Sequence, residues 1–269
     1  MDAFFVSYVL ASGILGLAIG SFLAARVART VAARPQNLWG RSHCFTCNSV
    51  LGPLDMIPLV SYTISRGKCR HCHTPYSSMY SWIELTTMLL FLLLSFVLFQ
   101  RWGTNVGLHW ISITSILLTG SLLLYTAFVD IKLRAFPVHP LLACTLLNLG
   151  IAVFGLPHTF LDALLASLMF AGSLAMVRFV GRWVAKQEVM GSGDVWLALL
   201  LGSSLGVTGS IVAFYGAFLS GAILGIGILY KAHRAQRRPN PLPFAPFLVF
   251  GWIIALLAGD PIFHLLFPL

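Results

Sequence analysis

Eight apolar segments constrain the fold of this chain more than any other feature of its sequence. They lie at residues 4–25, 83–99, 108–129, 139–154, 161–180, 194–205, 207–230 and 244–266. A helix needs about 20 apolar residues to cross a bilayer, and most of the segments reach or approach that length. The shorter segments 139–154 and 194–205 are tolerated at membrane depth where protein or a water-filled cavity covers their backbone. Because only 9% of the residues are charged, against about 25% in soluble domains, we predict an all-α polytopic membrane protein with about eight transmembrane helices.

The net charge of +9 is distributed unevenly along the predicted topology. Apart from Arg101, every Lys and Arg lies between predicted helices 1 and 2, 3 and 4, 5 and 6, or 7 and 8, with Arg178 in the last residues of the fifth helix. Cytoplasmic loops carry such an excess of positive charge. We therefore expect both termini outside and these basic loops in the cytoplasm, with the charge orienting the chain in the lipid bilayer and no nucleic acid as a partner.

The polar segment 27–80 contains two Cys-x-x-Cys pairs separated by 21 residues. Two such turns supply four thiolates for a tetrahedral Zn²⁺ site. The topology places them in the reducing cytoplasm, where disulfides are uncommon, so a structural zinc site is favoured over two disulfides. The predicted ligands are Cys44, Cys47, Cys69 and Cys72, with His43, His71 and His73 as rival ligands.

Two of the eight acidic residues are predicted to lie at the cytoplasmic ends of membrane helices. Asp130 ends the third helix and Asp194 begins the sixth, each beside one of the short segments. Ionisable groups at membrane depth are costly and usually functional. Two carboxyls that share a site keep one proton between them, so they can activate a water and protonate a leaving amine. The alternative is that each only caps a helix end.

Helix ends also suggest which of the two carboxyls is ionised. The helix dipole favours an anion at the helix start, where Asp194 lies, and disfavours one at the helix end, where Asp130 lies. We therefore expect Asp194 to be the ionised base and Asp130 to carry the proton. Gly191 and Gly193, which precede Asp194, allow its backbone to approach a partner closely.

Two functions without proteolysis also fit part of the sequence. A proton-coupled transporter places acids in membrane helices, although it favours acids in mid-helix over two acids at one edge. A membrane adaptor built on the zinc loop explains the cysteines but gives the Gly-Ser-Gly-Asp sequence at 191–194 no role.

Several motifs make the chain resemble the bacterial type IV prepilin peptidases, which are intramembrane aspartyl proteases with a Gly-Xaa-Gly-Asp motif. They are Gly-Ser-Phe-Leu at 20–23, the cysteine segment from Cys44 to Glu84, Asp130 seven residues before Pro137, Gly-Ser-Gly-Asp at 191–194, and Pro-Phe-Ala-Pro-Phe at 243–247. The resemblance spans nearly the whole chain. The sequence departs from the family pattern at Ala24, Val138, Trp196 and Ala245, among other positions, and it keeps both aspartates.

The resemblance implies an aspartic endopeptidase with Asp130 and Asp194 as its catalytic residues and Gly191 and Gly193 in the supporting loop. Its substrates and partners would be type IV prepilins or type II secretion pseudopilins, whose leader is cut at the cytoplasmic face of the bacterial inner membrane. Many relatives also methylate the new N-terminus with S-adenosylmethionine, and for this chain that activity stays open.

The predicted organisation has three parts. Residues 1–26 form the first membrane helix, 27–80 form the cytoplasmic zinc-binding segment, and 81–269 form the protease core of helices 2–8. Glu84 and Lys132 are candidate substrate contacts, with solvated interface residues as the alternative.

Overall fold

A computed structural model describes residues 3–32, 42–102, 109–134, 137–155, 157–186, 190–234 and 242–266. The chain divides into two compact units, Met1–Val106 and Gly107–Leu269. The described residues of both units are predominantly helical, and the strand-like pairing among them is limited to two isolated bridges. The predicted domain boundaries near residues 26 and 80 stay predictions.

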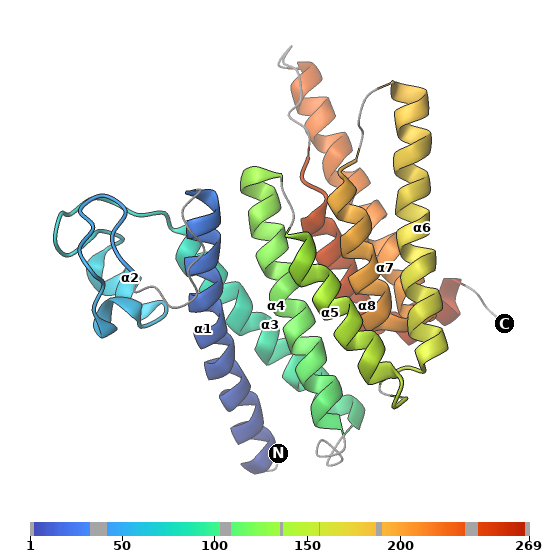
Figure 1. Ribbon diagram of the computed structural model, residues 1–269, viewed down its shortest axis with the longest axis horizontal. Coiled ribbons are helices and arrows are strands. Elements are labelled where there is room, and N and C mark those ends of the chain that lie inside the picture. Colours follow the sequence, from blue (N-terminus) through green and yellow to red (C-terminus); the bar gives the residue numbers. More distant parts are fainter. Residues whose placement is uncertain are drawn as a thin grey trace. The chain divides into compact units, whose positions relative to one another are not determined.

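The first unit is built on a pair of packed membrane helices. These are α1 (Ala3–Val31) and α3 (Met79–Trp102) (Figure 1). They are antiparallel, because the ring of Phe5 lies 4.7 Å from that of Phe99 at one end while Gly20 meets Glu84 at the other. A Cβ at Gly20 would lie 2.8 Å from the Glu84 Cα, so a small residue is what permits this close helix contact.

A small lobe connects α1 to α3 and holds the cysteines. It contains the 3₁₀ helix η1 (Pro53–Met56) and the short helix α2 (Val60–Ser65). Neither element has a buried residue. Hydrophobic burial within these two elements therefore contributes little to the stability of the lobe.

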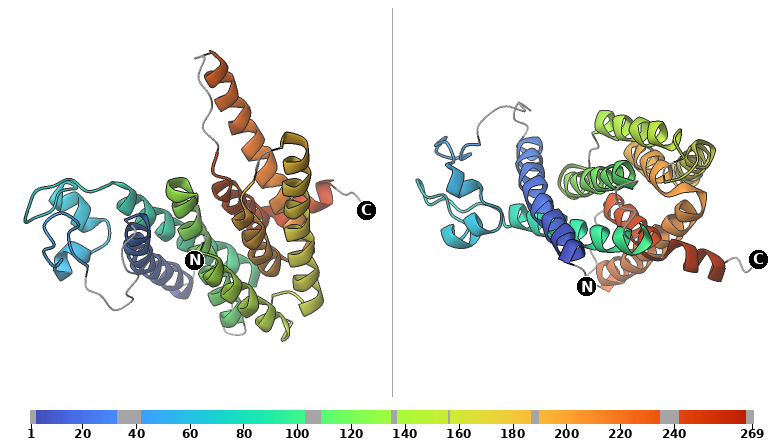
Figure 2. Two further views of the ribbon diagram at one scale, coloured as in Figure 1. Left: turned by 45° about the horizontal axis from the view of Figure 1, so that its top comes forward. Right: turned by 90° about the horizontal axis from the view of Figure 1, so that it is seen from below.

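The second unit is a helical bundle. Its helices are α4 (Trp110–Leu133), α5 (Val138–Ala152), α6 (Phe160–Ala185), α7 (Ser192–Arg234) and α8 (Ala245–Leu266). Both views of Figure 2 show α6 and α7 side by side. Among the described residues of the whole chain, six helices are long and apolar enough to cross a membrane: α1, α3, α4, α6, α7 and α8. The apolar helix α5 is shorter. The predicted all-α membrane class is confirmed.

Helix α7 is two helices that meet at Gly206. The backbone there is non-helical, with φ 69° and ψ −178°. Before this residue, Gly202 packs against Ala166 of α6, and after it Phe214 packs against Phe170, further along α6. The chain therefore reverses direction at Gly206. The halves 192–205 and 207–234 agree with the separate predicted segments 194–205 and 207–230.

Gly206 is held in a conformation that other residues adopt only with strain, which makes it a sensitive point. A Cβ there would overlap the Asp162 carboxylate, whose Oδ1 accepts a hydrogen bond from the Val207 N–H at 3.2 Å. We expect Gly206→Ala to destabilise the second unit by about 1–3 kcal/mol from backbone strain alone. A lower thermal unfolding midpoint in detergent would show this. Gly172→Ala is the control, since a Cβ at Gly172 has no described atom within 4 Å, and an equal midpoint for both variants would contradict the strain.

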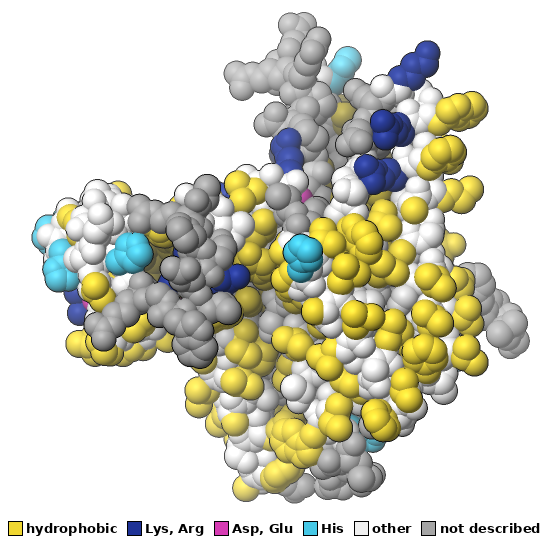
Figure 3. All heavy atoms as spheres, viewed as in Figure 1, with side chains coloured by type: hydrophobic (Ala, Val, Ile, Leu, Met, Phe, Trp, Pro, Cys, Tyr) yellow, Lys and Arg dark blue, Asp and Glu magenta, His cyan; other side chains and the backbone are white. Residues whose placement is uncertain are grey.

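Basic side chains gather at one end of the second unit. Figure 3 shows Lys and Arg along the end of α6, beside a surface covered by hydrophobic side chains. The last turns of α4, α6 and α7 contain Lys132, Arg182 and Lys231 with Arg234, respectively. The reversal at Gly206 places the start of α7 at this same end. The basic residues in 33–41 and 235–241 lie outside the described part of the chain, and which end faces the cytoplasm stays a prediction.

Candidate active site and metal centre

Asp130 lies in the last turn of α4 with its side chain turned into the bundle. It is only 4% exposed. Its Oδ2 accepts a hydrogen bond of 3.2 Å from the backbone N–H of Ala245, the first residue of α8. The carboxyl therefore joins the end of one helix to the start of another that is 115 residues away in the sequence.

Asp194 lies in the first turn of α7 and is equally buried, with 4% exposure. The backbone of Gly191 forms a hydrogen bond with its carboxyl. Its Oδ1 is buried and has no hydrogen-bond partner among the described residues. Gly193 is buried, whereas a Cβ at Gly191 would make only ordinary contacts. Crowding therefore does not explain the glycine at position 191.

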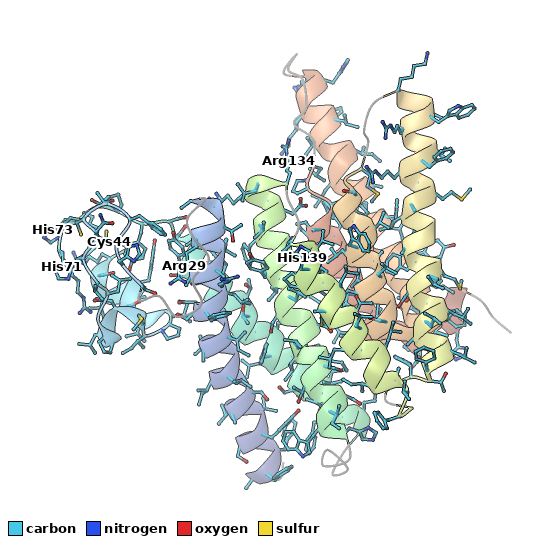
Figure 4. The ribbon with its side chains drawn as sticks, viewed as in Figure 1. Arg29, Cys44, His71, His73, Arg134 and His139 are labelled. Atoms are coloured by element: carbon cyan, nitrogen blue, oxygen red, sulfur yellow. The ribbon has the colours of Figure 1, made fainter. Side chains whose placement is uncertain are left out.

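The structure brings these two aspartates together within the second unit. Helix α4 contacts both α7 and α8, and the two carboxyls are close enough to interact electrostatically. The positive charge of Arg134, which follows α4, interacts electrostatically with the Asp130 carboxyl. That of Arg178 in α6 interacts in the same way with the Asp194 carboxyl. Figure 4 places Arg134 at the end of α4. A buried carboxyl pair with nearby guanidinium groups can hold a water and exchange a proton with it.

Two of these contributions were not predicted from the sequence. The charge distribution of the sequence indicates for Arg178 only a role in orienting the chain in the membrane. The group of Ala245 that donates a hydrogen bond to Asp130 is its backbone N–H, so no pattern of side chains predicts this bond. The motif 243–247, which contains that donor, was the one available signal.

Lys132 and Glu84 occupy different environments. Lys132 is exposed and follows Asp130 by two residues, in the last turn of α4. Glu84 belongs to the first unit and is only 9% exposed. Its Oε2 accepts a 2.8 Å hydrogen bond from the N–H of Leu59. Leu59 forms a tight turn with φ 60° and ψ −44°, a strained conformation for a non-glycine residue. Glu84 thus fastens the cysteine lobe to α3.

The two Cys-x-x-Cys turns have the same backbone geometry. The N–H groups of Cys44 and Cys69 each donate to the carbonyl five residues later, at 2.9 and 3.0 Å. Asn48 and His73, which follow the second cysteine of each pair, both have φ of 56°. Each turn is closed by an isolated bridge: His43 with Val50, and Lys68 with Pro75. The repetition indicates two equivalent ligand-bearing turns.

The four cysteines form one cluster of thiols. Their Sγ atoms all lie within 4.8 Å of one another, and no described histidine belongs to this group. The Sγ atoms of Cys44 and Cys72 are 3.8 Å apart. Tetrahedral zinc with Zn–S of about 2.3 Å requires sulfur separations of roughly 3.8 Å. Figure 4 shows Cys44, His71 and His73 in this same lobe. The donor set therefore fits a metal ion.

Hydrogen bonds prepare part of this cluster to bind a cation. Those from the side chain and backbone of Ser49 lower the pKa of the exposed Cys47 thiol to about 6. Backbone hydrogen bonds from Cys72 and His71 lower the pKa of the Cys69 thiol. Because the thiolate is the form that binds metals, these hydrogen bonds favour the metal-binding form of both groups.

A cavity of about 610 Å³ lies beside the thiol cluster, entirely within the first unit. It is lined by α1, both cysteine turns, α2 and the start of α3. Its lining includes three tyrosines, Tyr62, Tyr76 and Tyr80, and two carboxylates, Asp55 and Glu84. Its volume is typical of small-molecule sites, which cover about 300–1,000 Å³. No sequence pattern predicted this cavity.

Comparison with known proteins identifies the family. The model of the bacterial peptidase A24 N-terminal domain matches residues 14–98, and that of the type IV leader peptidase family matches residues 117–226. The first range contains the four cysteines and the second contains both aspartates. The apolar helices and the family matches together show that the chain is a multi-pass protein of the inner membrane and that its class is that of the membrane peptidases. It belongs to the type IV leader peptidase family.

Three relatives illustrate the similarity, and each is named prepilin leader peptidase/N-methyltransferase. That of Bacillus subtilis (strain 168) is 31% identical over 249 residues, which cover 93% of this chain and 94% of the relative. That of Aeromonas hydrophila is 35% identical over 240 residues, covering 85% and 75%. That of Myxococcus xanthus (strain DK1622) is 32% identical over 244 residues, covering 89% and 70%. No solved structure matches the chain.

Proposed function

We propose that this protein is an aspartic endopeptidase that removes the leader peptide of type IV prepilins or type II secretion pseudopilins. The observation that carries the proposal is the buried pair Asp130 and Asp194, which come from distant parts of the sequence and interact within one helical bundle. The names of the relatives agree with this activity.

The two carboxyls suffice for peptide hydrolysis without a covalent intermediate. The ionised carboxyl accepts a proton from a bound water while the water oxygen forms a bond to the scissile carbonyl carbon. The protonated carboxyl gives its proton to the carbonyl oxygen. The C–N bond then breaks, the amine leaves with the proton taken from water, and the second carboxyl recovers its proton as the carbonyl re-forms.

The basic residues at the end of the bundle support a cytoplasmic position for this chemistry. Lys and Arg are enriched on the cytoplasmic side of membrane proteins, and Lys132, Arg182 and Arg234 lie in the last turns of helices that finish at the end of the bundle where the aspartates lie. The cut then falls at the cytoplasmic membrane face, with both termini outside. Exposed Lys132 is placed to contact a substrate segment that enters there.

In the first unit, we assign the metal to zinc and give it a structural role. Cys44, Cys47, Cys69 and Cys72 would hold it, and a site closed by four thiolates leaves no open position for a substrate. The division into a first helix (1–26), a zinc segment (27–80) and a protease core (81–269) is retained as a proposal about which parts act together.

A second activity, methylation of the new N-terminus, is supported by the relatives' names and by the cavity beside the cysteines. S-adenosylmethionine would supply the methyl group. The tyrosine rings of Tyr62 and Tyr76 can pack on its apolar and cationic parts, and the carboxylate of Glu84 can attract its positive charge. Methylation stays secondary to cleavage in this proposal.

The test is a reconstituted assay with the purified full-length protein, a prepilin and S-adenosylmethionine. Mass spectrometry should show the prepilin shortened by its leader, with a further methyl group on part of the product if the second activity is present. A folded, zinc-loaded protein that leaves the prepilin intact, under conditions where the Bacillus subtilis relative cuts it, would favour the adaptor or transporter alternatives instead.

A further inference from the structure

The start of α8 lies directly against Asp130, one member of the candidate catalytic pair. The carbonyl of Phe244 accepts hydrogen bonds from the N–H groups of Phe247 and Leu248, so the helical hydrogen bonding of α8 begins there. The N–H of Ala245 has no place in that ladder, because the first N–H groups of a helix lack partners within it. The Asp130 Oδ2 satisfies this N–H instead, at 3.2 Å.

This hydrogen bond changes the electrostatics expected from the sequence. Asp130 ends its own helix, α4, where the dipole disfavours an anion. Its carboxyl nevertheless sits at the positive end of α8 and accepts a direct backbone hydrogen bond from it. Hydrogen bonds to an ionised acceptor are stronger than those between neutral groups. The contact with α8 therefore offsets the unfavourable end of α4.

Asp194 lacks an equivalent donor on one of its oxygens. It also lies in the first turn of a helix, α7, but its Oδ1 is buried with no described hydrogen-bond partner. A buried carboxylate oxygen without a donor is costly. As a protonated O–H, the same atom can donate to a bound water or to the other carboxyl.

We propose that the backbone N–H of Ala245 is a positioning group that holds Asp130 as the ionised base, so that Asp194 carries the shared proton. This reverses the assignment expected from the sequence alone, and it rests on the proposed peptidase function. Asp130 takes the proton from water as the water oxygen bonds to the scissile carbon. Asp194 gives its proton to the carbonyl oxygen and recovers it when the C–N bond breaks.

The charged groups around the pair come from several helices. Arg134, which follows α4, interacts with Asp130, and Arg178 of α6 interacts with Asp194. Lys132 in the last turn of α4 and His139 at the start of α5 are the other titratable side chains at these helix ends. Near its start, the described part of α8 offers no charged side chain, and its acid Asp260 lies close to its far end. The influence of α8 on Asp130 is thus exerted through its backbone.

One substitution removes this donor, although the proline ring adds atoms at a position that is 0% exposed and precedes Pro246. Proline is favoured at the first position of a helix, because the N–H lost there has no intrahelical partner. Ala245→Pro should therefore preserve α8 while deleting the hydrogen bond to Asp130. Ala245→Gly keeps the N–H and is the matched control. The thermal unfolding midpoint of each variant shows whether the bundle is intact.

The measurement is kcat/KM for prepilin cleavage as a function of pH. A hydrogen bond to a charged group corresponds to a shift of about one to two pH units. For Ala245→Pro we expect the acidic limb of the profile to move to higher pH by that amount, with about tenfold or greater loss of activity on this limb. Ala245→Gly should keep the acidic limb at its wild-type pH, whatever its overall rate. An unmoved limb, or a loss equal at every pH, would contradict the positioning role.

A second measurement does not depend on Ala245→Pro folding well. Infrared spectroscopy of the wild type should contain a protonated carboxylic acid band that disappears in Asp194→Asn and persists in Asp130→Asn. The opposite pattern would overturn the proposal in favour of Asp194 as the base. Neither result affects the peptidase assignment, which would fail separately if the wild type cut no prepilin.

Discussion

Asp130→Asn and Asp194→Asn are each expected to lower prepilin cleavage by at least about 10³-fold. General acid–base catalysis by one group contributes about 10²–10⁴-fold, and residues that act as a unit lose most of their effect when either is removed. An amide can neither accept the proton from water nor donate an acidic one. The measurement is the single-turnover cleavage rate of a prepilin by each purified variant.

A third aspartate in the same bundle provides the control. Asp162 of α6 lies at the opposite end of the second unit, where its Oδ1 accepts a hydrogen bond from the Val207 N–H. Asp162→Asn keeps an acceptor for that bond and should stay within about threefold of the wild-type rate, because the partly exposed ion pair with His158 contributes little. Retained cleavage in both Asp130→Asn and Asp194→Asn would remove the pair from the mechanism.

Removal of the metal is expected to unfold the cysteine lobe. Its apolar side chains are largely exposed: Leu54 is 63% exposed and Ile64 is 66% exposed. The lobe therefore lacks a hydrophobic core, and the metal supplies its folding energy. Structural zinc sites contribute about 10–16 kcal/mol of apparent binding free energy at neutral pH. A strong chelator, or the double substitution Cys69→Ser with Cys72→Ser, should abolish zinc binding and expose residues 42–78 to proteolysis.

The fifth cysteine distinguishes loss of the metal from loss of any thiol. Cys144 is buried in α5 of the second unit, and its Sγ lies 3.6 Å from the Thr119 hydroxyl. Cys144→Ser should keep the full metal content, measured by elemental analysis of the purified protein, and the proteolytic pattern of the wild type. A metal-free lobe that resists proteolysis as the wild type does would contradict the structural role of zinc.

The helices were predictable from the sequence because apolar length determines which segments can cross a bilayer. The interruption between 194–205 and 207–230 was also found, and the structure explains it by the conformation of Gly206. Helix ends were less predictable. Helix α1 continues to Val31 and α7 to Arg234, beyond the apolar segments, since a helix can extend past the hydrocarbon and its hydropathy does not mark where it stops.

The candidate site was predictable only in its side chains. Asp130, Asp194 and the cysteines are chemically distinctive residue types with informative spacing. The hydrogen bond from Ala245 to Asp130 depends on where two helix ends meet, and no local pattern encodes that meeting. The same holds for Glu84, whose bond to the Leu59 N–H arises from a turn 25 residues away.

The most direct test of the account is the separation of the two carboxyls in an experimental structure with a prepilin bound. In that complex we expect one Oδ atom of Asp130 and one of Asp194 each to lie within hydrogen-bond reach, about 2.6–3.2 Å, of a single water or of the scissile carbonyl. Carboxyls too far apart to share one water, or separated by packed apolar side chains, would contradict it.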